Sequence, residues 1–231
     1  QNGAVDFQIM RADLGQEERA HWQPWQEHVP GRLIKGMDGY KDFFTLIQSE
    51  HALPAIVIHN LRDGTSHTIA FDEQAYALGI TGSEEWDTSE TRFSYESPTT
   101  PGQVFDYNMT TRERALIKTQ EIPSGHSVED YVARRIMAPS HDGAQVPVTV
   151  MHHRDTPLDG TAPLYLYAYG SYGMSMPASF SIKRLSLADR GMITATAHIR
   201  GGADMGYGWY PDGKLERKPN PFHDFIAARA A

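Results

Sequence analysis

Apolar and polar residues alternate in short runs over the first half of the chain. The run LPAIVI at 53–58 is apolar, and the turn signal RDG and the segment SHTIAF follow it. The earlier stretch GRLIKGMDGYKDFFTLIQSE has the same form, with MDG expected at the turn between two strands. Asp-Gly between apolar runs is a strong signal for a β-hairpin. The pattern therefore predicts antiparallel strands and few helices.

The same rhythm returns over residues 91–120, where SPTTPG and TTRE separate three further strand-like runs. Together these stretches make roughly two and a half four-stranded units of about 45 residues each. Units of this length and pattern are typical of β-propeller blades. An all-β sandwich is the alternative that the pattern leaves open.

The pattern changes near residue 120, where the polar segment EIPSGHSVEDY predicts a boundary between domains. We expect a partial β-propeller domain over 1–119 and the N-terminal portion of a second, α/β domain over 120–231. Three β runs open the second domain, and a helix around SFSIKRLSLADRG follows, with Gly191 placed to end it.

The strand MITATAHI and a second helix come next. Asn220 is expected to cap that helix, with Pro221 at its first position and the helix running from Phe222. Strand, helix, strand and helix in this order predict right-handed crossovers and a mostly parallel sheet.

Composition excludes several classes of protein. The 231 residues carry a net charge of −8 and no basic stripe, so nucleic acid is not an expected partner. No run approaches 18 consecutive apolar residues, so no membrane span is expected. The absence of cysteine excludes disulfides, thiol nucleophiles and thiolate metal sites, and it fits a cytoplasmic protein.

Both termini interrupt a pattern. QNGAVDFQIM begins within an alternating strand-like run, and FHDFIAARAA ends within a helical one. We therefore expect the chain to be an internal fragment of a longer protein.

The segment YLYAYGSYG, residues 165–173, joins an aromatic β run to a glycine turn. The nucleophile elbow Gly-x-Ser-x-Gly is absent, because Tyr169 stands where the first glycine is needed, so Ser171 is expected to be a turn residue. The turn could instead offer a tyrosine hydroxyl or a backbone N–H to an oxyanion. By themselves, the residues favour strand and rim positions for all four tyrosines of this segment.

No histidine spacing matches a metal site. His152 and His153 are adjacent and would face opposite sides of a strand. His198, at a strand end, is expected to be packed or hydrogen-bonded rather than catalytic. GADMGYG at 202–208 fits neither of the common phosphate-binding fingerprints and is expected to be a flexible loop.

Four segments resemble motifs of the prolyl oligopeptidase family of serine peptidases, in the same order and at the same spacing. They are YGSYG, HIRGG, GYGWYPDGK and NPFHDFIA. The chain is most similar to the oligopeptidase B branch, and YNMTTRERALIKTQEIP upstream resembles a final propeller strand and linker. The resemblance implies the last two to three blades of a β-propeller, followed by the first part of an α/β-hydrolase domain.

The resemblance also implies a serine-type endopeptidase or oligopeptidase that needs no metal or organic cofactor. Its substrates would be short peptides, cut after Arg or Lys in the oligopeptidase B branch and after Pro in prolyl oligopeptidases. Tyr169 matches the tyrosine of the family's oxyanion hole, and Tyr172 matches an aromatic position beside the substrate pocket. Arg200, Gly201 and Gly202 match a loop near the active-site edge, for which we expect a structural role first.

The nucleophilic serine, the aspartate and the histidine of the family's triad are all expected beyond Ala231. We therefore expect the fragment alone to be inactive, with the remainder of the same protein as its partner. Two alternatives stay open. One is a non-catalytic, propeller-based binding module or inactive remnant. The other is an esterase or lipase on the hydrolase fold, which the β-rich first half disfavours, because such enzymes do not need it.

Overall fold

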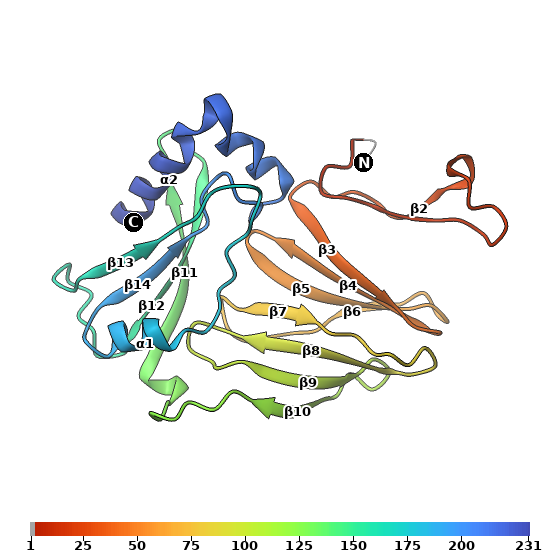
Figure 1. Cartoon of the computed structure of the whole chain (residues 1–231), viewed down its shortest axis with the longest axis horizontal. Helices are drawn as coiled ribbons and strands as arrows, with labels where there is room; N and C mark the ends of the chain where they lie inside the picture. Colours follow the sequence, from red (N-terminus) through yellow and green to blue (C-terminus); the bar gives the residue numbers. More distant parts are fainter. Residues whose placement is uncertain (1–2) are drawn as a thin grey trace.

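The structure is a computed structural model that describes residues 3–231. It has two parts that lie side by side (Figure 1). The N-terminal part contains two four-stranded antiparallel sheets, and the C-terminal part contains a third four-stranded sheet with two α-helices.

Each N-terminal sheet is an antiparallel meander in which every strand pairs with the next along the chain. The first blade consists of β3 (Arg32–Gly39), β4 (Phe43–Glu50), β5 (Leu53–Asn60) and β6 (Ser66–Thr68). The second blade consists of β7 (Ala77–Ile80), β8 (Glu90–Glu96), β9 (Gln103–Asn108) and β10 (Arg114–Thr119). A hairpin of β1 (Ile9–Arg11) and β2 (Gln23–Gln26) precedes them and extends away from both blades (Figure 1). Two blades and a hairpin confirm the predicted two and a half units.

The two Asp-Gly turns have different outcomes. RDG lies in the turn after β5, where Gly64 takes a positive φ of 72°, as predicted. The prediction of a turn at MDG is wrong, because Asp38 and Gly39 are the last residues of β3 and pair with Thr45 and Phe44. The turn falls after them and is closed by the Tyr40 N–H, which donates to the Phe43 carbonyl at 2.9 Å.

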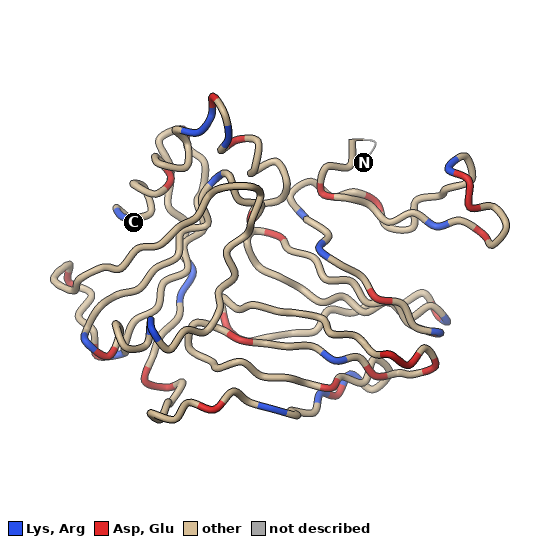
Figure 2. Tube along the Cα trace, in the orientation of Figure 1, with Lys and Arg blue, Asp and Glu red and all other residues tan. Residues whose placement is uncertain are grey.

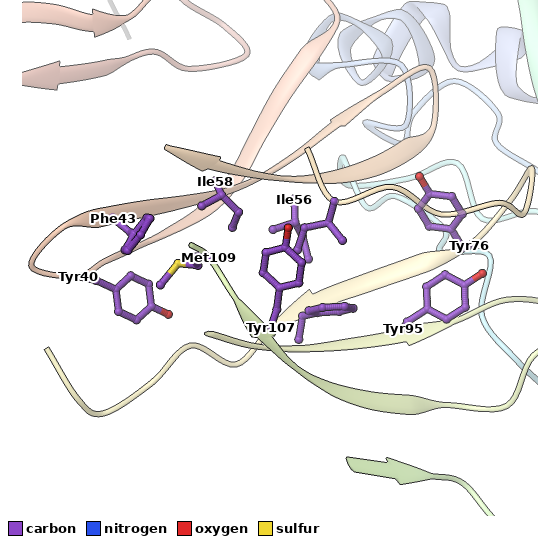
Figure 3. Close-up of a cluster of buried hydrophobic side chains, with 10 residues drawn as sticks. Tyr40, Phe43, Ile56, Ile58, Tyr76, Tyr95, Tyr107 and Met109 are labelled. Atoms are coloured by element: carbon purple, nitrogen blue, oxygen red, sulfur yellow. The ribbon is translucent and has the colours of Figure 1, made fainter. Parts of the chain in front are cut away.

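The core of the N-terminal part lies between the two blades (Figure 3). Its buried members are Tyr40, Phe43, Ile56, Ile58, Ile69, Tyr76, Phe93, Tyr95, Tyr107 and Met109. Inward-facing residues alternate along β5 and β8, as expected for strands with one buried face. Aromatic rings from both blades meet in this layer, so the blades hold each other in place.

The third sheet, called here the hydrolase sheet, has the order β11-β12-β14-β13. Its strands are β11 (Tyr131–Pro139), β12 (Gln145–His153), β13 (Leu164–Tyr167) and β14 (Ile193–Ala197). The prediction of a mostly parallel sheet is wrong for these strands, since only β13 and β14 are parallel. The short link between β11 and β12 allows only an antiparallel hairpin, whereas β13 and β14 are joined through a helix, as a parallel pair requires.

The two helices, α1 (Ile182–Ala188) and α2 (Pro219–Ala230), cover opposite faces of the hydrolase sheet. Val146 and Val148 of β12 face α2, whose Ala228 belongs to the same cluster. Met151, an odd position on that strand, faces α1 and packs on Leu185. Because side chains alternate between the faces of a strand, this single strand contributes to both layers.

The ends of the helices were predicted with mixed success. Gly191 follows α1 with a positive φ of 80°, as predicted. The predicted start of α2 at Phe222 is wrong by three residues, because Pro219 takes the first helical position and Lys218 precedes it. Asn220 is not a cap: its side-chain amide donates to the Asp212 carbonyl at 2.9 Å.

Five short 3₁₀ helices complete the elements found between residues 3 and 231. They are η1 (Arg19–His21), η2 (Val128–Asp130), η3 (Tyr207–Trp209), η4 (Pro211–Gly213) and η5 (Leu215–Arg217). Within the same residues, no helix has the length and apolar character needed to cross a membrane. Basic and acidic positions are interspersed along the blades (Figure 2), and Lys41 joins the two blades by an ion pair with Asp87 at 2.6 Å.

Candidate active site

The candidate site lies where β13 and β14 end. These strands are parallel, so their carboxyl ends meet at one edge of the hydrolase sheet. The Tyr169 turn, residues 169–173, follows β13 there, and the Arg200 loop, residues 198–206, follows β14. The structure thus brings together all five residues singled out from the sequence, which lie in these two segments.

Two glycines let the turn and the loop interlock. Gly170 is buried with a positive φ of 62°, and a Cβ there would come within 2.6 Å of the Ile199 side chain. Gly201 has a φ of 91°, and a Cβ there would collide with the Gly170 carbonyl oxygen. The Gly173 N–H donates to the Gly201 carbonyl at 2.9 Å. The close approach of the two backbones requires glycine at both positions.

The two tyrosines of the turn project from this interlocked base. The Tyr169 side chain is 41% exposed and has no hydrogen bond to any residue between 3 and 231. Tyr172 is 80% exposed and has a positive φ of 57°, a conformation that costs an ordinary residue roughly 1 kcal/mol. The turn therefore presents a hydroxyl donor at the sheet edge, whereas Tyr165 and Tyr167 lie within β13, as predicted.

Ser171 occupies the first position of a turn, as predicted, and its carbonyl accepts from the Met174 N–H at 3.1 Å. No helix follows directly, since α1 begins only at Ile182, so the strand-to-helix geometry of a nucleophile elbow is missing. The hydroxyl of Ser171 accepts a hydrogen bond from Lys218 Nζ at 2.9 Å. This lysine also donates to the Gly170 carbonyl at 2.9 Å, so it is bonded to two residues of the turn.

Arg200 points away from the tyrosines and into the protein. Its guanidinium makes a two-pronged contact with the carboxylate of Asp224 on α2, with N–O distances of 2.9 and 2.6 Å. It also contacts Asp142 at 2.5 Å, in the hairpin between β11 and β12. The Ser140 hydroxyl donates to the same Asp224 carboxylate at 2.7 Å. Arg200 therefore fastens the loop to α2 and to the sheet.

Two charged groups in this cluster, Arg200 and Asp142, have shifted pKa values. Hydrogen bonds to Asp224, and then to Asp142, raise the pKa of the Arg200 guanidinium above its usual range. The hydrogen bond from Arg200 lowers the pKa of Asp142 from its ordinary 3.8 to about 2. Arg200 and Asp142 are thus both charged at neutral pH, as their ion pair needs.

A second buried cluster has the order of a catalytic triad. Thr149 Oγ1 lies 2.9 Å from His198 Nε2, and His198 Nδ1 lies 3.0 Å from Asp204 Oδ1. All three residues are at most 5% exposed, so no substrate carbonyl can reach the Thr149 hydroxyl. The cluster is structural, and the prediction that His198 is packed and hydrogen-bonded is confirmed.

The segment after β14 is not the flexible loop expected from its glycines. Asp204 is buried, and its backbone carbonyl accepts from the Ala52 N–H of the first blade at 2.8 Å. A second hydrogen bond joins this segment to the N-terminal part: the Tyr207 N–H donates to the buried carboxylate of Asp6 at 2.5 Å. Glycine here serves close packing, since a Cβ at Gly206 would come within 2.7 Å of Gly31 Cα.

The sequence did not single out Lys218, Asp204 or Asp224. Lys218 precedes the helix start that the sequence predicts, so capping preferences do not single it out. Asp204 and Asp224 carry no local signal, since their partners lie on other elements. No group of three or more His, Asp or Glu side chains among residues 3–231 could hold a metal ion.

Comparison with known proteins gives matches over most of the chain. The model of the prolyl oligopeptidase N-terminal β-propeller domain matches residues 1–120. The model of the prolyl oligopeptidase family matches residues 178–231.

Individual relatives cover nearly the whole chain. It is 40% identical to dipeptidyl aminopeptidase BI of Pseudoxanthomonas mexicana, over 97% of this chain and 31% of that protein. It is 33% identical to protease 2 of Moraxella lacunata, over 98% of this chain and 32% of that protein. Oligopeptidase B of Leishmania major superposes with a TM-score of 0.89 at 30% identity, over 100% of this chain and 33% of that chain.

These matches confirm the order of a β-propeller followed by the start of a hydrolase domain. They also rule out the sandwich alternative for the first half. The chain spans about a third of the length of the relatives that it matches, consistent with the expected fragment.

Proposed function

Because the chain belongs to the prolyl oligopeptidase family, we propose that it is part of a serine peptidase and supplies that enzyme's oxyanion-hole turn. The observation that carries the proposal is the Tyr169 turn. Gly170 and Gly201 fix its base, and Tyr169 is exposed at the carboxyl edge of the sheet. The serine, histidine and aspartate of the triad would come from the rest of the protein.

The reaction is acyl transfer. When the serine hydroxyl attacks a peptide carbonyl, its proton passes to the histidine and the carbonyl oxygen becomes negative. The phenolic O–H of Tyr169 donates a hydrogen bond to that oxygen. A donor that is already in place stabilises the tetrahedral intermediate by roughly 3 kcal/mol, because it needs no reorganisation during the reaction. Tyr172, on the same turn, would contact the substrate side chain.

For the substrate, we propose short peptides cleaved after Arg or Lys. The support is the similarity to oligopeptidase B of Leishmania major and to protease 2 of Moraxella lacunata. A second candidate is removal of dipeptides from a free N-terminus, favoured by the 40% identity to a protein named dipeptidyl aminopeptidase. Cleavage after proline is the third, from relatives named prolyl endopeptidase.

The test uses the full-length protein. Internally quenched peptides with a single Arg, Lys or Pro separate the first and third candidates, and peptides with free or acetylated N-termini identify the second. Tyr169→Phe should lower kcat roughly ten- to a thousand-fold with little change in KM, because only the transition-state oxyanion is affected. Tyr165→Phe, in the adjoining strand and similarly exposed, is the matched control and should leave kcat unchanged.

Three outcomes would contradict the proposal. Hydrolysis that is unchanged in Tyr169→Phe removes this hydroxyl from the mechanism. A full-length protein that cleaves none of these peptides favours the non-catalytic binding module. Activity of the isolated 231-residue chain would mean that the nucleophile lies within it.

A further inference from the structure

Lys218 stands where the electrostatics of a helix disfavour a cation. It directly precedes Pro219, the first residue of α2, and no side chain caps that end of the helix. The N-terminus of a helix carries a partial positive charge, so a lysine there is unfavourable for the helix itself. A capping side chain does not suit this position either, because the backbone of Lys218 is already helical, with φ −58° and ψ −25°, directly after η5. The preference of the helix therefore does not explain the residue.

The contacts of the side chain do explain it. Lys218 is half-buried, and its Nζ donates to the Gly170 carbonyl and to the Ser171 hydroxyl, both at 2.9 Å. These two acceptors belong to the residues that directly follow Tyr169. Hydrogen bonds from a charged donor are shorter and stronger than those between neutral groups. The ammonium thus joins α2 to the Tyr169 turn.

The two sides of the turn are held by different elements. On one side, the Gly173 N–H is bonded to the Gly201 carbonyl of the Arg200 loop. On the other side, Lys218 is the residue within 3–231 that donates to the buried carbonyl of Gly170. Without it, that carbonyl would be left without a partner and the peptide plane between Gly170 and Ser171 could rotate. This plane is separated from Tyr169 only by Gly170, so its rotation changes the backbone that directly follows Tyr169 and, through it, the direction of the side chain.

We propose that Lys218 is a positioning residue of the oxyanion hole: its bridge to Gly170 and Ser171 fixes the direction of the Tyr169 hydroxyl. This inference rests on the proposed function, because it acts through the role of Tyr169 in acyl transfer. Ser171 then serves as the second acceptor of the bridge, which gives its hydroxyl a role other than that of a nucleophile.

The test is a double-mutant cycle in the full-length protein. Lys218→Met keeps the length of the stem and removes the donor, and it should lower kcat roughly ten- to a hundred-fold with KM nearly constant. In the Tyr169→Phe background, the same change should lower kcat by no more than about twofold, because the hydroxyl that Lys218 positions is gone. Lys218→Arg, which keeps a charged donor, should restore most of the activity.

Two further variants serve as controls. Lys183→Met, on the exposed face of α1, should leave kcat unchanged in both backgrounds. Ser171→Ala leaves the bond to the Gly170 carbonyl intact and should cost less than Lys218→Met. If Lys218→Met does not fold, Lys218→Gln, which removes the charge but keeps a polar end, takes its place in the same cycle.

The outcomes separate the two proposals. If the wild-type protein cleaves peptides and Lys218→Met lowers kcat equally in both backgrounds, the effect is purely structural and the positioning role is overturned. If Lys218→Met has wild-type kcat, it is overturned as well. If the wild-type protein cleaves no peptide, the proposed function itself fails, and the role of Lys218 in it fails too.

Discussion

The two parts of the molecule are held together by different forces. The core between the blades is made of aromatic and branched side chains, many of them fully buried (Figure 3). The main cluster of the hydrolase part has mostly small members, Ala138, Val146, Val148, Ala195, Ala197, Ile199 and Ala228. Beside it lie two buried polar clusters, one around Arg200 and one around His198.

The difference follows from what each part must position. Apolar packing is non-directional, so it can hold whole sheets against one another but does not fix the angle of a single turn. Hydrogen-bonded charges have directional geometry, and they lie at the edge of the hydrolase sheet that carries the Tyr169 turn. The molecule therefore uses apolar area for the scaffold and buried polar contacts for the candidate site.

Among the substitutions that test this difference, Asp224→Ala should have the largest effect on stability. The change removes the Asp224 carboxylate, which accepts two hydrogen bonds from the Arg200 guanidinium, and leaves this 5% exposed charge with Asp142 as its remaining carboxylate partner. We expect a loss of about 3–5 kcal/mol in the free energy of unfolding of the full-length protein. Urea denaturation measures the loss, and hydrogen exchange should locate it in β14 and α2. A loss that is equal to that of an exposed control, Glu216→Ala, would contradict the structural role of the cluster.

A smaller effect is expected in the blades from Ile58→Val. Ile58 is fully buried between the sheets, and deleting one methyl group from such a core costs about 0.5–1.5 kcal/mol. Faster hydrogen exchange should be confined to β4, β5 and β8. The kcat of the full-length protein should stay the same, because no directional contact of the candidate site is touched. A change in kcat would show that the scaffold and the site are not separate.

The smallest effect is on the pH dependence of stability, through Asp142→Asn. The folded-state pKa of Asp142 is lowered from 3.8 to about 2, so its stabilising contribution is complete above pH 4 and disappears as the pH falls towards 2. The carboxylate is 39% exposed, which allows solvent to screen the pair and keeps the effect small. Melting temperatures between pH 2 and 5 should fall less steeply in the variant. Parallel curves for the two proteins would exclude the contribution.

The blades could be predicted from the sequence because their contacts are local. Each strand pairs with its neighbour along the chain, and alternation gives the strands directly. The prediction of a turn at MDG is wrong because Asp38 stays in β3, where its carboxylate accepts from the hydroxyl of Tyr40, two residues on, at 2.9 Å. Turn chemistry in the sequence does not reveal such a contact.

The candidate site was only partly predictable. The position of Tyr169 follows from the motif, and the turn nature of Ser171 follows from the missing glycine. The partners of Arg200 lie 24 and 58 positions away, at Asp224 and Asp142, and no periodicity connects them. The predicted start of α2 is wrong because the backbone is already helical at Lys218, directly after η5, and no side chain caps the helix there.

One contact described above bears on the order in which the protein assembles during synthesis. The carboxylate of Asp6 accepts from the Tyr207 N–H, and these residues are 201 positions apart. Both blades have left the ribosome before Tyr207 is made, and a loop of that length closes late in folding. Until then, Asp6 can be held by the nearby Gly31 N–H, which donates to it at 2.8 Å. This contact of the junction thus forms only after both blades have been made, with a carboxylate that the N-terminal part can already hold.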